Sequence, residues 1–346
     1  MRGGEKVVES LCRLLPEADL FTLFYEPDRV SPLLRSRRVQ TSFLNPVRRF
    51  HRWMLPLMPV ALEQFDLRGY DLVISSESGP AKGVLTSARA RHVCYCHTPM
   101  RYLWELYPAY LHDWTQSRLR RAVMAPVATA LRLWDYASAA RVDTFLANSR
   151  NVKQRIWKTY RREAEVIYPP VAVETFFWKP PEDYYLAVGE LVAYKRFDAA
   201  VEFCTRTGRK LKLVGEGPEY RRLRKLAGNE VEFCGRVPDE QLRELYARSR
   251  ALLMPGEEDF GMTAVEALAS GKAVIALGRG GACETVPSGD PMGGALFPPP
   301  ADQCLGAAME RWERDESSVQ PEPLRQWASR FSEREFHARM RKTLCI

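Results

Sequence analysis

The chain has 346 residues, more than one ordinary hydrophobic core accommodates, which favours two domains of roughly 150 residues each. Its composition of 46% hydrophobic and 27% charged residues excludes a disordered or fibrous protein. The eight cysteines form no CxxC pair, and there is no apolar run of about 18 residues. We therefore expect free thiols and a soluble, cytoplasmic protein.

The net charge of +8 is unevenly distributed along the chain. Residues 1–168 hold 26 Lys and Arg against 16 Asp and Glu, a net charge of +10, whereas residues 169–346 carry a net charge of −2. A basic first half predicts an anionic partner. Nucleic acid, a phospholipid surface and a phosphorylated substrate all satisfy that description.

The chain opens on MRGGEKVVESL, which predicts a Gly-Gly turn leading into a helix with no strand before it. Backbone N–H groups and the helix dipole converge at such a turn, so Gly3 and Gly4 are candidate phosphate contacts. Because such turns normally follow a strand, we expect either a start upstream of Met1 or a domain that lacks its first strand.

The remainder of the first half alternates less regularly between strand and helix patterns. A long Arg-bearing and aromatic helix is expected from about residue 114 to 141, and a Pro-bearing linker at 168–183. The candidate strands are 19–25, 71–76, 91–97, 143–149 and 165–171.

The second half alternates more clearly. We expect strands at 184–191, 211–217, 231–237, 251–256 and 272–277, and helices at 195–207, 218–228, 239–249 and 262–270. Asp239 is the expected cap of the third helix, and Gly271 the stop of the fourth. This alternation predicts an α/β fold of two doubly wound, Rossmann-like domains with the ligand in the cleft between them.

The segment GEEDFGMTAVEALASG, residues 256–271, places one glutamate before a helix and another inside it. The N–H groups at the start of that helix are suited to an anion such as a diphosphate; they belong to Phe260, Gly261, Met262 and Thr263. Glu258 and Glu266 would flank the anion and accept hydrogen bonds from sugar hydroxyls. The combination predicts a nucleotide-sugar site, and the alternative is that both glutamates solvate a surface helix.

Seven blocks of sequence follow one another in the order found in a known enzyme family. They are MRGGEK (1–6), YCHTPMRYLWE (95–105), VGELVAYKRFD (188–198), LVGEGPE (213–219), VEFCGRVPDEQL (231–242), EEDFGMTAVEA (257–267) and GGACETV (280–286). With these blocks the chain resembles the retaining glycosyltransferases of family 4, which have the GT-B fold.

The resemblance implies roles for individual residues. Lys195 would neutralise the departing diphosphate, Glu258 would hold hydroxyls of the donor sugar, Glu266 would hold the ribose, and His97 would lie beside the sugar. Further donor contacts are implied at Gly3, Gly4, Glu190, Arg196, Gly235, Arg236 and Val237, and acceptor contacts at Arg101, Tyr102 and Trp104. No metal and no cofactor are expected. Glu190 stands where most relatives carry arginine, so a pseudo-enzyme that binds the donor without transferring the sugar is an alternative.

The resemblance also implies a domain layout. Residues 1–170 would form the N-terminal Rossmann-like domain, residues 171–324 the nucleotide-sugar domain, and residues 325–346 a helix that returns to the N-terminal domain. The docking residues of that helix would be Trp327, Phe331 and Phe336.

Donor and acceptor are less well defined. The block HTPMRYLWE most resembles mannosyltransferases that use GDP-mannose in O-antigen or exopolysaccharide assembly, with a UDP-hexose as the alternative donor. The acceptor would be a glycan or a lipid-diphosphate-linked sugar, reached where residues 114–143 rest on an anionic membrane surface. A nucleotide-sugar epimerase remains an alternative, and nucleic-acid binding fits the basic half less well than a sugar donor does.

Overall fold

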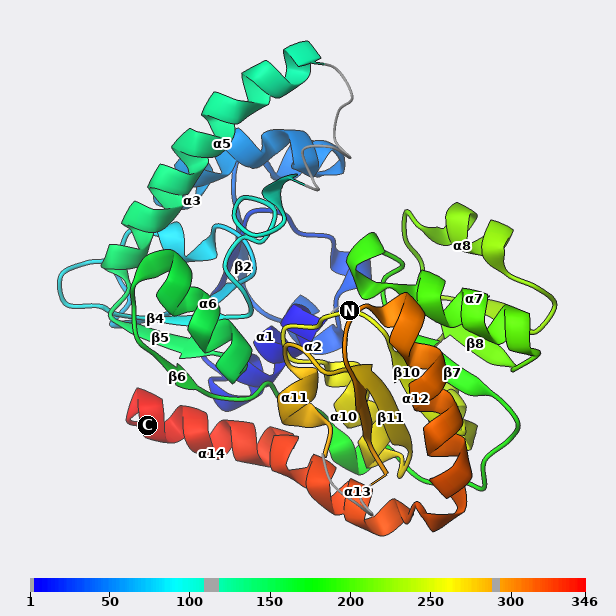
Figure 1. The fold of residues 1–346 in the computed structure, drawn as a ribbon. Coiled ribbons are helices and arrows are strands. Elements are labelled where there is room, and N and C mark those ends of the chain that lie inside the picture. The colour runs from blue at the N-terminus through cyan, green and yellow to red at the C-terminus, as the bar shows by residue number, and fades with distance from the viewer. Residues whose placement is uncertain (1–2, 109–117, 288–292) are drawn as a thin grey trace. The chain divides into compact units, whose positions relative to one another are not determined.

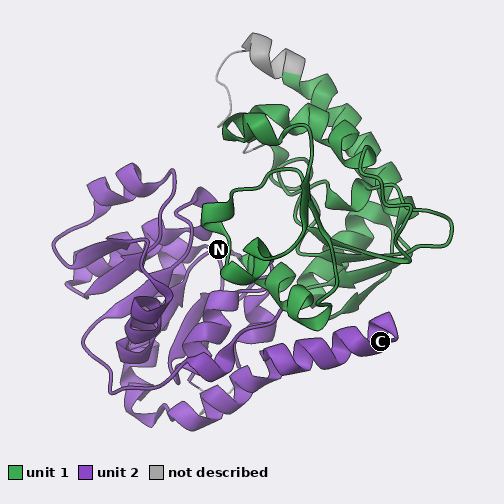
Figure 2. Ribbon diagram, turned by 180° about the vertical axis from the view of Figure 1, so that it is seen from behind, with its two compact units in different colours: residues 1–168 green, residues 169–346 purple. Residues whose placement is uncertain are grey.

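The structure is a computed structural model that describes residues 3–108, 118–287 and 293–346. The chain divides into two compact units, Met1–Tyr168 and Pro169–Ile346, which Figure 2 shows in different colours. This division falls two residues before the expected boundary at residue 170. Each unit is built around its own parallel sheet structure.

The C-terminal unit contains a six-stranded parallel sheet with the strand order β12-β11-β10-β7-β8-β9 (Figure 1). Its strands are β7 (Tyr185–Val188), β8 (Leu211–Val214), β9 (Val231–Gly235), β10 (Ala251–Met254), β11 (Ala273–Leu277) and β12 (Ala295–Phe297). This is the doubly wound order in which the chain first runs outward in one direction and then crosses to the other side of β7. The switch point of the topology therefore lies between β7 and β10, where ligands of such sheets bind.

Helices cover both faces of this sheet, because the strands are buried on both sides. Packing of α7 on α8 and α12 covers one face, and α10 packs between the sheet and α13 on the other. The helices are α7 (Phe197–Thr207), α8 (Tyr220–Leu226), α9 (Asp239–Arg248), α10 (Met262–Ala269), α11 (Ala282–Thr285), α12 (Ala301–Asp315), α13 (Pro321–Ala328) and α14 (Glu333–Leu344). Short 3-10 turns are η5 (Val173–Thr175), η6 (Ala193–Lys195), η7 (Glu316–Ser318) and η8 (Ser329–Phe331).

The ends of two helices test the sequence expectations directly. Helix α10 stops where predicted, because Gly271 adopts a φ of +68° and the N–H groups of Gly271 and Lys272 return to the carbonyls of Leu268 and Ala267, both at 2.9 Å. The expected capping role of Asp239 is wrong. Asp239 is the first residue of α9, preceded by Pro238, and makes no side-chain capping bond.

The segment expected as one helix over 325–346 is divided by the 3-10 turn η8. After this turn, Ser332 caps α14 by accepting a hydrogen bond from the Glu335 N–H at 3.3 Å. The docking of Trp327, Phe331 and Phe336 on the N-terminal domain stays a prediction. The Trp327 indole donates to the Thr285 carbonyl at 2.8 Å, and the Phe331 ring packs edge-on to Phe260. Both of these partners belong to the C-terminal unit.

The N-terminal unit contains two parallel sheets instead of one. Strands β1 (Leu20–Thr22) and β2 (Val39–Thr41) form a pair, and a four-stranded sheet has the order β3-β4-β5-β6. The strands of the larger sheet are β3 (Leu72–Glu77), β4 (Arg91–Cys96), β5 (Thr144–Ala147) and β6 (Ala164–Val166). Most strands predicted here exist in shorter form, whereas β2 lies in a stretch that the sequence pattern did not indicate.

The two sheets contact each other through side chains. Among the described residues, no backbone hydrogen bond joins them. The Tyr70 ring lies edge-on to Phe21, with 5.6 Å between ring centroids, and the Tyr70 hydroxyl donates to Asp19 at 2.5 Å. Side chains of β1 are half-buried, whereas β4 is buried almost throughout. In the C-terminal unit, β7 lies between β8 and β10, the strands that correspond to β1 and β3 of the N-terminal unit. No described strand lies between β1 and β3. The expected absence of a first strand stays a prediction.

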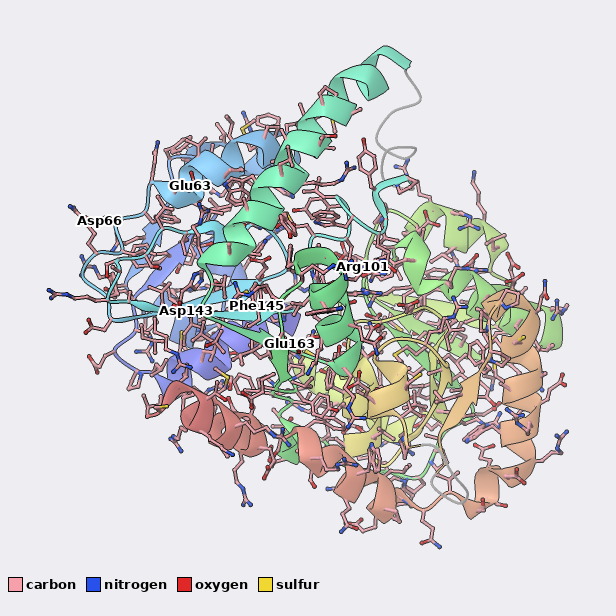
Figure 3. The ribbon with its side chains drawn as sticks, turned by 60° about the vertical axis from the view of Figure 1, so that its left-hand side comes forward. Glu63, Asp66, Arg101, Asp143, Phe145 and Glu163 are labelled. Carbon is pink, nitrogen blue, oxygen red and sulfur yellow. The ribbon has the colours of Figure 1, made fainter. Side chains whose placement is uncertain are left out.

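Several helices and turns surround these sheets. They are α1 (Gly3–Leu14), η1 (Pro27–Arg29), α2 (Pro32–Arg35), η2 (Asn45–Leu57), α3 (Met58–Glu63), η3 (Ala81–Gly83), α5 (Arg118–Ser138), η4 (Ala139–Arg141) and α6 (Arg150–Tyr160). Glu63 joins α3 to the end of α5 (Figure 3), accepting hydrogen bonds from the Trp134 indole at 2.9 Å and from Arg141 at 3.0 Å. The predicted free thiols are confirmed, since all eight cysteines are unpaired with one another.

A fully buried charge cluster fixes the carboxyl end of β3. Lys82 forms ion pairs with Glu77, at 2.9 Å, and with Asp135. Asp135 also accepts hydrogen bonds from the Trp104 indole at 2.7 Å and the Tyr160 hydroxyl at 3.0 Å. Burial raises the pKa of Glu77 to about 7. Burial alone would lower the pKa of Lys82, but the two carboxylates outweigh it and raise that pKa.

We predict that Lys82→Met destabilises the protein by about 3–5 kcal/mol at neutral pH, because two buried carboxylates lose their cation. Glu77 has a folded-state pKa above its unfolded value, so its contribution to stability falls as the pH rises. Losing the ammonium accentuates this trend, and the cost of Lys82→Met should therefore be smaller at pH 5 than at pH 8. Urea unfolding at both pH values, with the exposed Lys158→Met as control, measures it. An equal cost at both pH values would contradict the assignment.

Candidate functional site

An ion pair between Lys195 and Glu258 lies at the switch point of the C-terminal sheet. Lys195 ends η6, in the loop that follows β7, and Glu258 follows β10. These two strands are neighbours in the sheet although more than sixty residues separate them in the sequence. The Lys195 Nζ lies 2.8 Å from Glu258 Oε1, and both side chains are largely buried. The structure thus brings together two residues that the sequence assigned to one ligand.

Glycines make the close approach of these loops possible. A Cβ on Gly256 would lie 2.4 Å from the Lys195 Cα, so the loop after β10 packs directly against the backbone of the lysine loop. A Cβ on Gly189 would lie 2.6 Å from the Lys195 ammonium, which therefore crosses the end of β7 above a bare backbone. The Glu258 carbonyl is held from the other side by the Gly281 N–H at 2.8 Å.

The N-terminus of α10 opens beside Glu258. Gly261 precedes the helix with a φ of +90° and has no side chain to cap it, so the first N–H groups, at Met262 and Thr263, have no acceptor within the helix. Phe260 is buried and anchors this turn by packing on Phe331. A bare helix N-terminus next to an ammonium is an environment that favours an anion.

Glu266 lies one turn into α10 and is only 4% exposed. Its Oε2 accepts a hydrogen bond from the Tyr246 hydroxyl at 2.9 Å. Tyr246, on α9, is itself buried against Phe176. Tyr246 therefore fixes the position of the Glu266 carboxylate, a role that the sequence gave no sign of because Tyr246 reads as an ordinary core residue of an amphipathic helix.

The other candidate donor contacts of this unit lie on neighbouring loops. Arg196 directs its guanidinium to Asp198 at 3.1 Å and Asp302 at 3.3 Å, which ties the loop to α7 and α12. Glu190 follows Gly189 and is half-buried. Gly235 has a φ of +61° and accepts the Gly215 N–H at 2.8 Å, with exposed Arg236 and half-buried Val237 directly after it. These loops all follow the carboxyl ends of strands.

In the N-terminal unit, His97 is the centre of a second cluster. It follows β4, and its backbone N–H donates to the Glu77 carbonyl at 2.7 Å. Its Nε2 lies 2.8 Å from Ser76 Oγ, and a Cβ on Gly4 would lie 3.5 Å from the same nitrogen. Gly3 and Gly4 are the first residues of α1 and not a turn ahead of it, which corrects the sequence expectation. The structure nevertheless brings Gly4 and His97 together, as the resemblance implied.

Burial lowers the pKa of His97 to about 4, so the ring is neutral at physiological pH. Ser76 fixes the orientation of that ring, and the sequence did not identify it. Ser76 is the penultimate residue of β3 and pairs in register with Tyr95, whereas His97 directly follows β4, so alternation alone cannot show that these two side chains meet.

The proposed acceptor residues lie in the loop after His97. Arg101 and Arg155 of α6 both approach Glu105, at 3.8 and 3.3 Å, which places Arg101 near α6 (Figure 3). The Tyr102 hydroxyl lies 3.0 Å from the Met100 sulfur. The Trp104 indole is committed to the buried Asp135, so Trp104 holds the loop on the core.

Within the residues that the structure describes, no group of three or more His, Cys, Asp or Glu side chains is arranged to hold a metal ion. In the same residues, no helix combines the length and the apolarity needed to cross a bilayer.

Comparison with known families decides the assignment. The sequence profile described as Glycosyltransferase Family 4 matches residues 1–175, just over half of the chain, and that of Glycosyl transferases group 1 matches residues 174–331. The chain belongs to glycosyltransferase family 4. The sequence blocks that suggested this family span both matched regions.

Curated relatives and solved structures agree with this family. An uncharacterised glycosyltransferase (MJ1178) of Methanocaldococcus jannaschii is 28% identical over 152 residues, which is 42% of this chain and 43% of that protein. The sulfoquinovosyl transferase SQD2 of Arabidopsis thaliana is 34% identical over 80 residues, which is 22% of this chain and 16% of that protein. The matches thus span less than half the length of either relative.

Two solved structures cover nearly the whole chain. Sucrose-phosphate synthase from Thermosynechococcus elongatus has a TM-score of 0.72 at 18% identity, covering 98% of this chain and 91% of its own. Anabaena HepE (Alr3699) in complex with UDP-glucose has a TM-score of 0.72 at 16% identity, covering 100% of this chain and 96% of its own. These similarities confirm the predicted GT-B fold of two Rossmann-like domains.

We predict that Gly256→Ala disrupts the ion pair of this family 4 member, because the new Cβ meets backbone atoms of Tyr194 and Lys195 that cannot rotate away. The expected cost is about 2 kcal/mol or more in the free energy of unfolding. Gly69→Ala is the matched control, since nothing lies within 4 Å of its Cβ. Urea denaturation of both variants should separate them, and equal stability would show that the loops do not pack as described.

We predict that His97→Gln makes the protein less sensitive to acid. The folded-state pKa of His97 is about 4, below its unfolded value, so its contribution to stability is present above pH 6.5 and is lost as the pH falls towards 4. Stability measured from pH 7 to pH 5 should therefore decline less steeply in His97→Gln than in the wild type. The exposed His51→Gln is the control, and an unchanged slope in His97→Gln would contradict the buried, neutral ring.

Proposed function

We propose that this protein is a retaining, metal-independent glycosyltransferase that moves a hexose from a nucleotide diphosphate sugar to a glycan or lipid-linked acceptor in cell-envelope polysaccharide synthesis. The ion pair of Lys195 and Glu258 beside the open N-terminus of α10 carries this proposal. Lys195 supplies a cation for a diphosphate, and the start of α10 supplies N–H groups for it. The Glu258 carboxylate next to them can accept hydrogen bonds from sugar hydroxyls.

The chemistry of the transfer requires this combination. Negative charge grows on the leaving diphosphate while positive charge grows at the anomeric carbon. Fixed cations and N–H dipoles that are already in position stabilise the growing negative charge without reorganising, which is usually the largest single catalytic contribution. Lys195 and the start of α10 would act in this way.

The mutual pairing of Lys195 and Glu258 leaves both groups with capacity for a ligand. An ammonium has three N–H donors and a carboxylate has about four acceptor positions, and their contact uses one of each. Lys195 can therefore donate to a diphosphate while Glu258 accepts from a hydroxyl. The pair also holds each charge in place.

The neutral His97 suits a residue that donates or accepts a single hydrogen bond with a sugar, since it adds no net charge near the anomeric centre. We propose front-face transfer, in which the leaving phosphate takes the proton of the acceptor hydroxyl. No covalent glycosyl intermediate is required for retention in that scheme, and His97 positions the sugar.

GDP-mannose remains the proposed donor from the sequence resemblance, and a UDP-hexose is the alternative. HepE, which shares the fold of the whole chain, has been solved in complex with UDP-glucose, so a UDP-hexose is kept as the alternative. An epimerase would release an altered nucleotide sugar without an acceptor, and a pseudo-enzyme would bind the donor and leave it unchanged. Incubation with a purified acceptor mixture, followed by analysis of the nucleotide products, separates these activities.

We predict different effects for the two members of the ion pair. Lys195→Met leaves Glu258 to repel the diphosphate. This variant should therefore weaken the binding of nucleotide diphosphates and of nucleotide sugars alike, by at least about tenfold. Glu258→Gln keeps the Lys195 ammonium but loses the charged acceptor for sugar hydroxyls. It should therefore weaken the binding of nucleotide sugars more than the binding of the bare nucleotides. Thermal-shift titrations with UDP, GDP, UDP-glucose and GDP-mannose measure both.

Lys225→Met and Glu240→Gln, exposed positions of the same unit, are the matched controls and should retain the wild-type shifts. The proposal fails if the wild type responds to none of the four ligands, or if Lys195→Met binds them as the wild type does.

A further inference from the structure

The segment from Phe43 to Val60 exposes a stripe of large apolar side chains on the N-terminal unit. The most exposed is Trp53 at 73%, and Phe50 is 47% exposed. We call these residues the apolar stripe; its members are Phe43, Val47, Phe50, Trp53, Leu57 and Val60. The members are three or four residues apart in the sequence. Phe43 precedes η2, the next four members lie in η2, which is kinked with non-helical backbone at Val47 and Phe50, and Val60 lies in α3.

This concentration stands out within the described part of the chain. Thirteen large hydrophobic side chains are exposed there, and six of them belong to the apolar stripe. Single exposed apolar residues are ordinary, whereas a contiguous group marks an interaction surface.

The opposite face of the same segment is buried in the hydrophobic core. Leu44, Leu55, Met58 and Ala61 pack in one buried cluster with Met100 and with Leu131 of α5. The segment is therefore apolar on two faces, and among the described residues only the inward face is covered. A helical segment that needed only to cover the core would carry polar residues on its outward face.

Arginines predominate around the apolar stripe, although the half-exposed Glu26 carboxylate lies 3.9 Å from the Arg48 guanidinium. Residues 30–62 contain six arginines and neither aspartate nor glutamate. Arg48 and Arg49 are exposed between members of the stripe, and the Arg49 guanidinium lies over the Phe50 ring at 4.8 Å. The long arginine side chains can lie along an apolar surface while their charged ends reach outward.

This charge pattern decides between possible partners. A second copy of the same face would bring arginines against arginines, which opposes self-association. A surface that is apolar inside and negatively charged at its edge complements both properties at once, and an anionic lipid bilayer has that structure.

We propose that the apolar stripe and its arginines dock the protein on an anionic membrane, with Phe50 and Trp53 inserted among the lipids and Arg48 and Arg49 at the headgroups. Tryptophan and arginine are suited to these two depths. The surface differs from the one expected at residues 114–143, part of which lies outside the described residues. The inference deepens the proposed function, on which its biological meaning rests, because a lipid-linked acceptor would be met at such a surface.

The test is flotation of the full-length protein with vesicles of phosphatidylcholine alone and of phosphatidylcholine with phosphatidylglycerol. The wild type should float with the anionic vesicles and lose most of that binding at high salt. Phe50→Ser combined with Trp53→Ser, and separately Arg48→Glu combined with Arg49→Glu, should each reduce binding at least tenfold. Both pairs replace outward side chains, so circular dichroism should show an unchanged fold.

Matched controls on the same unit are Trp157→Ser, an exposed tryptophan outside the stripe, and Arg89→Glu, an exposed arginine outside it. Both should float like the wild type. The proposal is overturned if the wild type does not bind anionic vesicles, if the stripe variants bind as well as it does, or if the controls lose as much binding. It is also overturned if the wild type dimerises without lipid and the stripe variants are monomeric, which would identify the face as a contact between copies.

Donor binding is measured on the same variants by thermal shift. Stripe variants that lose vesicle binding should keep the donor-induced shift of the wild type, since the stripe belongs to the N-terminal unit and the donor contacts at Lys195 and Glu258 belong to the other. Vesicle binding without any response to nucleotides would remove the proposed function and leave the membrane surface standing.

Discussion

The contact between the Lys195 ammonium and the Glu258 carboxylate depends on the topology of the C-terminal sheet more than on any local sequence. The two residues follow β7 and β10, the strands where the winding of the sheet changes direction, and their loops meet only because those strands are neighbours. Gly256 allows the two backbones to touch. With the start of α10 alongside, the pair forms a compact arrangement of fixed charge and dipoles.

In the N-terminal unit, by contrast, the charged cluster is fully buried and its members pair with one another. Lys82, Glu77 and Asp135 are buried together and fix the end of β3, from which the Glu77 carbonyl positions the His97 backbone. The His97 ring is neutral and is held by Ser76. Buried ion pairs seldom add much stability over a well-packed apolar core, so their value here is the fixed position that they give to the neighbouring strand ends. In the N-terminal unit the buried charges fix local geometry, whereas the proposed role of Lys195 and Glu258 in the other unit is to contact a ligand.

Sequence patterns predicted the elements well where several signals agreed. The stop of α10 at Gly271 followed from a glycine after an apolar helix, and the family was evident from seven short blocks in order. Prediction failed where one local signal stood alone. Asp239 had the chemistry of a cap but lies one position inside its helix. The type of a side chain determines which interactions it can make. Its tertiary surroundings determine which of those interactions form.

The sequence by itself determined the α/β alternation, the family and the residue types available to the site, since these follow from periodicity and from short motifs read along the chain. Only the tertiary structure decided that Lys195 and Glu258 pair, that Ser76 and Tyr246 hold His97 and Glu266, and that the apolar stripe faces outward. The physical reason is the same in each case. Periodicity shows which residues share a face, but whether that face is covered, and by what, depends on distant segments that meet only when the chain folds.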